Sequence, residues 1–117
     1  MTAPFFELIS VSESDGQHTA AVRLNAEHPV YNGHFPDQPV APGVMLMNMC
    51  REVAEKVRGE EVRIRSARSI KFVKVVDPRK IQDLVLTLKF VDGEGGTRFQ
   101  CVAKAGEDTY FKIIATI

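Results

Sequence analysis

The sequence is short of several features that mark specialised proteins, and each shortage excludes a class. It has no tryptophan, and Lys+Arg and Asp+Glu both number 15, which leaves a net charge of zero. Without a basic excess, nothing in the composition favours nucleic acid or an anionic membrane as a partner. One local basic cluster stands out, and it is expected to form the solvent-facing side of a strand: Arg63, Arg65, Arg68, Lys71 and Lys74.

Long apolar runs are also missing. A membrane-spanning helix needs about 18 consecutive apolar residues, and no such stretch occurs. The first ten residues, MTAPFFELIS, carry no basic segment ahead of a hydrophobic one, so no signal peptide is expected. We therefore expect a cytoplasmic protein without a membrane span.

Cysteine is scarce, with Cys50 and Cys101 alone. Neither belongs to a CxxC or Cys/His spacing, which argues against a zinc site, and no other metal site is expected. Cys50 lies in an apolar helical pattern and Cys101 in an alternating strand pattern. Both are therefore expected to be small core residues of a protein that folds in a reducing compartment.

The length and composition are those of one globular domain. The chain has 117 residues, 44% of them hydrophobic and 26% charged. This is enough for a single hydrophobic core with little to spare. We therefore expect one domain over residues 1–117, with no linker and no internal repeat.

Alternation of apolar and polar residues predicts a chain made mostly of strands. One helix, over residues 42–58, interrupts them after the second strand. This order predicts an α+β fold in which an antiparallel sheet wraps around a single helix. Such a sheet leaves open edges and apolar surface, so a dimer that joins two sheets is expected. The predicted strands cover residues 5–11, 20–24, 62–76, 84–90, 99–103 and 111–117.

The predicted helix has clear boundaries and two unlike halves. Pro42 suits a first helical turn, and Gly59 suits the position just after a helix. The second half is amphipathic, with charged residues on one side only. The first half, VMLM over 44–47, is apolar all round, which predicts burial on every side.

The candidate functional residues lie mainly in the loop before this helix. Residues 26–41 hold three prolines, the turn-forming pair Asn32-Gly33 and two histidines, His28 and His34, with room for one short helical turn. The loop leads directly to a helix N-terminus, where free N–H groups and the helix dipole favour negative charge. A titratable imidazole beside such donors is suited to handling a proton and a carbonyl group.

The segment HPVYNGHFPDQPVAPGVMLMNM resembles the active-site segment of the 3-hydroxyacyl-(acyl carrier protein) dehydratases. That family has the pattern GHFPxxPxxPG followed by an apolar helix, and its hotdog fold is a sheet wrapped around one central helix. The chain is similar to compact members from bacterial polyene and fatty-acyl pathways. The spacing is unbroken and the matching positions are Gly33, His34, Phe35, Pro36, Pro39, Pro42 and Gly43.

The resemblance implies a mechanism. The substrate is a 3-hydroxyacyl thioester on the phosphopantetheine arm of an acyl carrier protein or of coenzyme A, and no separate cofactor is needed. A histidine removes the proton at C2, a helix carboxylic acid from the partner subunit assists departure of the hydroxyl group, and backbone N–H groups hold the thioester oxygen. Carried over, His34 is the base, and Val40 and Gly43 supply the N–H groups. Outside this motif, a turn histidine is more often simply satisfied by backbone contacts.

The chain departs from the family at the helix carboxylate. That group lies fourteen positions after the histidine, which is Asn48 here. Asparagine can form hydrogen bonds with a hydroxyl group or a water, but it cannot deliver a proton. Glu52 lies one turn further, about 5.4 Å away. The polar neighbours of Asn48 leave open that it is ordinary surface, whereas its apolar neighbours suggest burial.

Four residues are candidates for lining an acyl tunnel: Tyr31, Phe35, Met45 and Met47. Core packing is the alternative for each of them. His28, which precedes a proline, is expected to be structural.

Three functions remain open. The first is a dehydratase with His34 and Asn48 in the site. The second is a thioesterase on the same fold, because an amide suits positioning of a water. The third is a non-catalytic acyl-binding or partner subunit, because the carboxylate is missing.

Overall fold

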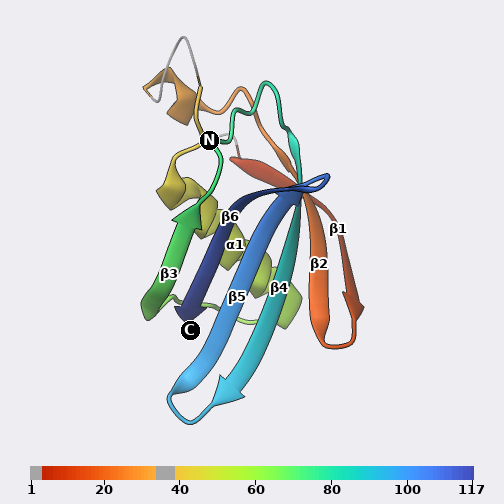
Figure 1. Ribbon diagram of the computed structural model, residues 1–117, viewed down its shortest axis with the longest axis vertical. Coiled ribbons are helices and arrows are strands. Elements are labelled where there is room, and N and C mark those ends of the chain that lie inside the picture. The colour runs from red at the N-terminus through yellow and green to blue at the C-terminus, as the bar shows by residue number, and fades with distance from the viewer. Residues whose placement is uncertain (1–3, 34–38) are drawn as a thin grey trace.

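The computed structural model describes residues 4–33 and 39–117, and shows one long helix lying across a twisted sheet (Figure 1). The α-helix α1 spans Gly43–Arg58, and a 3-10 turn, η1, spans Pro29–Asn32. The strands are β1 (Phe6–Ser14), β2 (Gln17–Leu24), β3 (Ser66–Phe72), β4 (Asp83–Gly93), β5 (Gly96–Ala105) and β6 (Asp108–Thr116).

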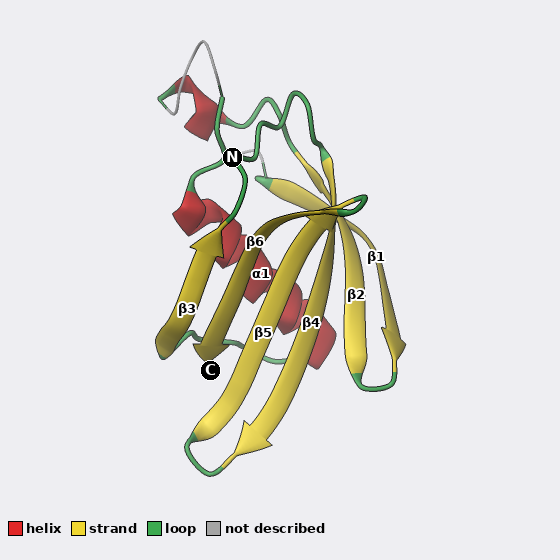
Figure 2. Cartoon of the chain, in the orientation of Figure 1, coloured by secondary structure: helices red, strands yellow, loops and turns green. Residues whose placement is uncertain are grey.

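The six strands form one sheet in the order β1-β2-β4-β5-β6-β3, and every neighbouring pair is antiparallel. The helix α1 covers one face of this sheet, and the other face has no helix over it in the described part of the chain (Figure 2). The predicted α+β architecture is therefore confirmed. β3 follows the helix in sequence and lies at the sheet edge beside β6.

The core lies between α1 and the inner face of the sheet. On β4, Leu84, Leu86 and Leu88 are almost completely buried, because every second side chain of a strand points to the same face. The helix side chains follow the spacing of one helical face, and burial of each large one contributes about 1.5–3 kcal/mol to folding. The buried helix residues are Leu46, Met49, Cys50, Val53 and Ala54.

The ends of α1 agree with the prediction. Pro42 takes the N-cap position with extended backbone (φ −65°, ψ 141°). Gly59 ends the helix in the left-handed region at φ 70°, and its N–H donates to the carbonyl oxygen of Glu55 at 2.8 Å. Glycine enters this conformation without the steric cost of a Cβ atom.

The strand predicted over 62–76 is too long, because only Ser66–Phe72 forms β3. Before it, the N–H of Val62 donates to a side chain, Glu55 Oε2, at 3.0 Å instead of joining the sheet. After it, the N–H groups of Val73 and Lys74 both converge on the carbonyl oxygen of Tyr110, which ends the regular pairing. Apolar alternation continued past both ends of the true strand, and tertiary contacts decided where pairing stopped.

The prediction that the first half of the helix is buried on every side is also wrong for the isolated chain. Val44 is 68% exposed, and Met45 and Met47 are partly exposed, whereas Leu46 is buried. The cause is geometric, because a single sheet covers only one side of the helix. Exposed apolar side chains continue from there along β3 and the segment after it, at Ile70, Phe72, Val73 and Val75.

The two cysteines lie in the core, as predicted. Cys50 on α1 and Cys101 on β5 are fully buried, and their Sγ atoms are 3.1 Å apart. Both are free thiols. Burial and the neighbouring Cys101 raise the pKa of the Cys50 thiol, so it stays protonated.

Candidate active site

The predicted base lies outside the described residues. His34 and Phe35 both fall in the segment 34–38, so their assignments remain predictions. The structure describes the chain on both sides of that segment, from η1 up to Gly33 and from Pro39 into α1.

On the N-terminal side, η1 is capped by a histidine. The Nδ1 atom of His28 accepts a hydrogen bond from the N–H of Val30 at 3.0 Å, and the His28 ring packs edge-on against Phe5 at 5.7 Å. This is the structural role expected for His28. It holds the first turn of η1 and thereby sets the direction in which the chain enters the loop.

Tyr31 is buried in η1. Its side chain is 5% exposed, and its ring stacks on Phe5 at 6.4 Å. The hydroxyl group is buried and has no hydrogen-bond partner among residues 4–33 and 39–117. Burial, together with the negative charge of Asp77, raises the pKa of Tyr31 to about 12. In the described residues the ring of Tyr31 packs in the core with Phe5, which is the core-packing alternative, and it borders none of the grooves described below; its place in an acyl tunnel stays a prediction.

On the C-terminal side, the two predicted N–H donors lie at one pocket. The pocket holds about 300 Å³ and is bordered by Val40, Gly43 and the ring of Phe72. The N–H of Ala41 donates to the carbonyl oxygen of Val76 at 2.8 Å, which ties the chain just before the helix to the sheet side of the molecule. Gly43 occupies the first turn, where N–H groups have no acceptor within the helix.

Asn48 lies on the exposed side of α1. It borders two grooves, of about 600 and 580 Å³, and Met45 borders both of them with it. Met47 borders the second groove only. The sequence left open whether Asn48 is buried or exposed. In the isolated chain it is exposed and lies between two partly apolar grooves.

The structure does not bring Asn48 to the pocket of its own chain's donors. Five helical positions separate it from Gly43, which corresponds to a rotation of about 140° around the helix axis. Asn48 and the donor pocket therefore open on different sides of α1. None of the three hollows joins Asn48 to Val40 and Gly43 within the described residues of one chain.

Asn48 is held by Arg51, one turn along the helix. The Nε atom of Arg51 donates to Asn48 Oδ1 at 2.9 Å. The same guanidinium donates to the carbonyl oxygen of Val62 at 3.1 Å and pairs with Glu55 Oε2 at 2.9 Å. The N–H of Val62 and then Arg51 lower the pKa of Glu55, so the pair is ionised at neutral pH.

Sequence reasoning placed Arg51 and Glu55 only on a polar helix face. The spacing of Asn48, Arg51 and Glu55 at three and four positions was available as a signal, because residues at these separations are neighbours on a helix. The contact with Val62 was not available, since it depends on how the chain returns after Gly59.

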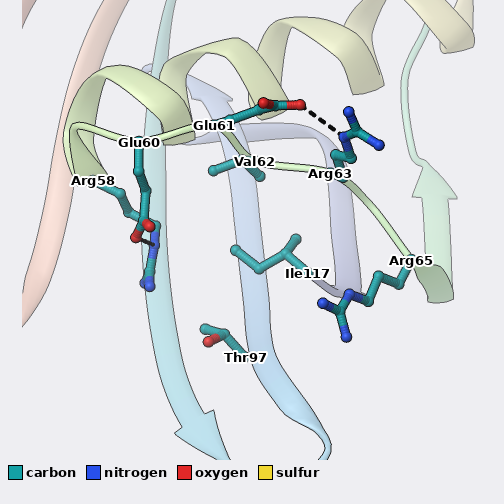
Figure 3. Close-up of a pocket in the computed structure, with 8 residues that line it drawn as sticks. All are labelled: Arg58, Glu60, Glu61, Val62, Arg63, Arg65, Thr97 and Ile117. Carbon is teal, nitrogen blue, oxygen red and sulfur yellow. Dashed lines mark hydrogen bonds and ion pairs between the residues drawn. The ribbon is translucent and has the colours of Figure 1, made fainter.

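A further pocket lies at the opposite end of α1 from Gly43, beside Thr97 and Ile117 (Figure 3). Its charges are largely matched, because Arg58 pairs with Glu60 at 3.2 Å and Arg63 with Glu61 at 2.7 Å. The basic cluster is exposed, as predicted, but it is not one strand face. Only Arg68 and Lys71 of its members lie on β3.

Two further properties bear on the site. Across residues 4–33 and 39–117, no three His, Cys, Asp or Glu side chains gather as a metal site would require. In the same residues, no helix has the length and apolar content to cross a bilayer.

In a comparison with protein families, residues 10–112 fit the family model described as ApeI-like, ApeI dehydratase. The curated relatives include the 3-hydroxyacyl-[acyl-carrier-protein] dehydratase FabZ of Streptococcus suis (strain 98HAH33), 34% identical over 70% of this chain. The enzyme of the same name from Streptococcus sanguinis (strain SK36) is 33% identical over the same share. The matched region spans 62% of the length of either relative.

Solved structures share the fold. The dehydratase heterocomplex ApeI:P from Xenorhabdus doucetiae superposes with a TM-score of 0.77 at 18% identity, over 94% of this chain and 95% of that one. An uncharacterised protein from Erwinia carotovora subsp. atroseptica gives a TM-score of 0.64 at 22% identity, over 94% and 90%.

Proposed function

The chain belongs to the ApeI-like dehydratase family, and on that premise we propose that it eliminates water from 3-hydroxyacyl thioesters in fatty-acyl or polyene biosynthesis. The resemblance seen in the loop motif is thereby confirmed at the level of the family, and the hotdog fold with it. The observation that carries the proposal is the unbroken loop motif from Gly33 to Gly43, which ends at a helix N-terminus beside an apolar pocket.

In the proposed reaction, His34 takes the proton from C2 of the substrate. The C3–O bond breaks, the electron pair of the former C2–H bond forms the C2=C3 double bond, and the hydroxyl leaves as water. The N–H groups of Val40 and Gly43 hold the thioester oxygen as negative charge develops on it. Asn48 binds the departing hydroxyl. The proton that converts this hydroxyl to water comes from His34 or from solvent. The phosphopantetheine arm belongs to the substrate, and the proposal uses no other cofactor.

We further propose that two copies of the chain assemble so that Asn48 of one faces the donor pocket of the other. Two observations support this assembly. Asn48 and the donor pocket face different sides of α1. Apolar side chains are exposed at Val44, Phe72 and Val75. The edge strand β3 is exposed along its whole length and offers unpaired backbone groups for joining two sheets. Such an assembly would cover the apolar first half of α1.

A second assembly is favoured by Asn48. The ApeI:P structure is a dehydratase heterocomplex, and a chain without the helix carboxylate is suited to pairing with a different subunit that supplies it. Mass measurement in solution, alone and with candidate subunits from the same pathway, distinguishes two copies from a mixed pair. In a mixed pair, activity would appear only when both subunits are present.

We propose that an acyl carrier protein carries the acyl group on its phosphopantetheine arm. Coenzyme A thioesters are the simpler alternative. The free cysteines agree with a reaction in the cytoplasm.

The test is conversion of 3-hydroxyacyl thioesters of several chain lengths, on carrier protein and on coenzyme A, followed by mass spectrometry. The expected product is the enoyl thioester with its carrier retained, and His34→Ala is expected to lower the rate by about 100- to 10,000-fold with the fold intact by circular dichroism. Free acid and free thiol as products would instead show a thioesterase. An alanine variant as fast as the wild type would remove His34 from the mechanism.

A further inference from the structure

The side-chain amide of Asn48 can turn either its accepting carbonyl oxygen or its donating NH2 group toward a substrate. The guanidinium of Arg51 has no accepting atom, so the Asn48 atom that lies 2.9 Å from its Nε must be the carbonyl oxygen. The NH2 group is therefore turned away from Arg51. Within the described residues it has no acceptor, and Asn48 borders both grooves.

Arg51 is itself held on three sides. It contacts Glu55 and the carbonyl oxygen of Val62 in addition to Asn48. The N–H of Val62 returns to Glu55 Oε2, which closes a ring of charge-assisted hydrogen bonds between α1 and the chain leading to β3. The nearby acids Glu60 and Glu61 are paired with Arg58 and Arg63, so they do not compete for Arg51 (Figure 3).

We infer that Arg51 is a positioning residue that makes Asn48 a hydrogen-bond donor, so the substrate group that meets Asn48 is an accepting oxygen atom rather than a water about to attack. This deepens the proposed function and rests on it for the identity of the substrate. A water that attacks a thioester needs an acceptor for its proton. One lone pair of the Asn48 carbonyl already accepts from a cation, which makes this oxygen a poorer proton acceptor and leaves the NH2 group as the end turned to the grooves. A donor next to a positive charge suits a departing hydroxyl, on which negative charge grows.

Arg51 also decides whether an acid placed at position 48 could act as a proton donor. A Glu or Asp at position 48 would lie beside the Arg51 guanidinium, and an adjacent opposite charge favours the ionised carboxylate. It would then be unable to donate a proton at neutral pH. Restoring the acid therefore requires a second substitution, at Arg51.

The first test needs no catalytic activity. In Asn48→Asp, the pKa of the new carboxyl group is measured by NMR titration, with Arg51 present and with Arg51→Gln added. The expected result is a rise in this pKa by about one unit when Arg51 is removed. Equal values in the two proteins would overturn the inference, whatever the enzyme does.

A matched control removes a different positive charge. Lys56 lies on α1 and borders the first groove with Asn48, eight positions further along the helix. Adding Lys56→Gln to Asn48→Asp is expected to change the pKa of the new carboxyl group by no more than a few tenths of a unit.

Other titratable groups also border the two grooves. They are Glu52 and Glu55 on α1, and His28, Glu61 and Arg63 from other elements.

The second test is kinetic. Asn48→Glu alone is expected to give no gain in dehydration over wild type, whereas Asn48→Glu with Arg51→Gln is expected to be about tenfold faster than Asn48→Glu. Its rate would fall as the pH rises through the pKa of the new acid. A large gain from Asn48→Glu alone would contradict the inference. If no protein in the series dehydrates any thioester, the proposed function fails, and the NMR titration still decides the role of Arg51.

A third comparison separates positioning from simple stability. In the wild-type background, Arg51→Gln is expected to lower kcat by roughly ten- to a hundredfold with little change in KM, and Arg51→Lys to recover part of it. Thermal unfolding of the same variants shows whether the fold is kept, since Glu55 still holds Val62 when Arg51 is changed. A KM effect without a kcat effect would assign Arg51 to substrate binding instead.

Discussion

The ring of Phe72 lies where a side chain at position 43 would have to be. A Cβ atom on Gly43 would lie 2.7 Å from Phe72 Cζ, closer than nonbonded carbon atoms approach. Gly43 has an ordinary helical backbone, so its absence of a side chain serves this close approach rather than an unusual φ angle. Phe72 in turn packs on Phe111 at 6.2 Å while remaining 51% exposed.

This contact predicts a change of sign in a double-mutant cycle. Gly43→Ala alone is expected to lower the free energy of unfolding by about 1 kcal/mol, because the ring of Phe72 must shift. In a Phe72→Ala background the same change is expected to be neutral or stabilising, since alanine is the better helix former by up to about 1 kcal/mol. Urea denaturation of the four proteins measures the coupling. An equal cost in both backgrounds would show that Phe72 is not the obstacle.

The buried hydroxyl group of Tyr31 predicts an effect at high pH. Burial and the charge of Asp77 raise its pKa to about 12, whereas an unfolded tyrosine titrates near 10. The folded state therefore binds the proton more tightly. The stability linked to this group is fully present below pH 10 and is lost as the pH rises from 10 through 12. Tyr31→Phe is expected to remove this part of the alkaline loss, measured by thermal unfolding across that range.

The same variant tests whether the hydroxyl group has a partner. An unpartnered buried hydroxyl costs about 1–3 kcal/mol, so Tyr31→Phe is expected to leave stability at pH 7 unchanged or to raise it. A clear loss of stability at pH 7 would mean that the hydroxyl group forms a hydrogen bond in solution.

The two core thiols are expected to be unreactive in the folded protein. Cys50 and Cys101 are fully buried, and burial raises the pKa of Cys50, which removes the reactive thiolate. Iodoacetamide at pH 8 is therefore expected to label neither residue until denaturant is added, as read by mass spectrometry. Rapid labelling without denaturant would show that α1 separates easily from β5.

Much of the fold followed from local pattern. The strands β4, β5 and β6 were predictable because one side of each is buried, so apolar and polar residues alternate along them. The helix limits followed from Pro42 and Gly59, which act through their own backbone preferences. β3 was overestimated because apolar residues on both sides of it are held by other partners, such as Tyr110.

The sequence predicted which residues form the candidate site better than it predicted how they are arranged in space. The loop motif indicated the family, and the asparagine at position 48 was visible by counting from His34. Whether Asn48 was buried or exposed was open in the sequence, because that depends on what covers the far side of α1. Arg51 was visible too, but not its contact with the chain beyond Gly59.

By itself the sequence determined the order of helix and strands, the loop motif, and the replacement of a helix acid by an amide. Each of these depends on neighbours along the chain, through strand and helix periodicity and through the fixed backbone of proline. Only the tertiary structure decided that Arg51 also binds the carbonyl oxygen of Val62 and that Phe72 covers Gly43. These contacts join or depend on segments far apart in sequence, and the free energy of packing them together has no local signature.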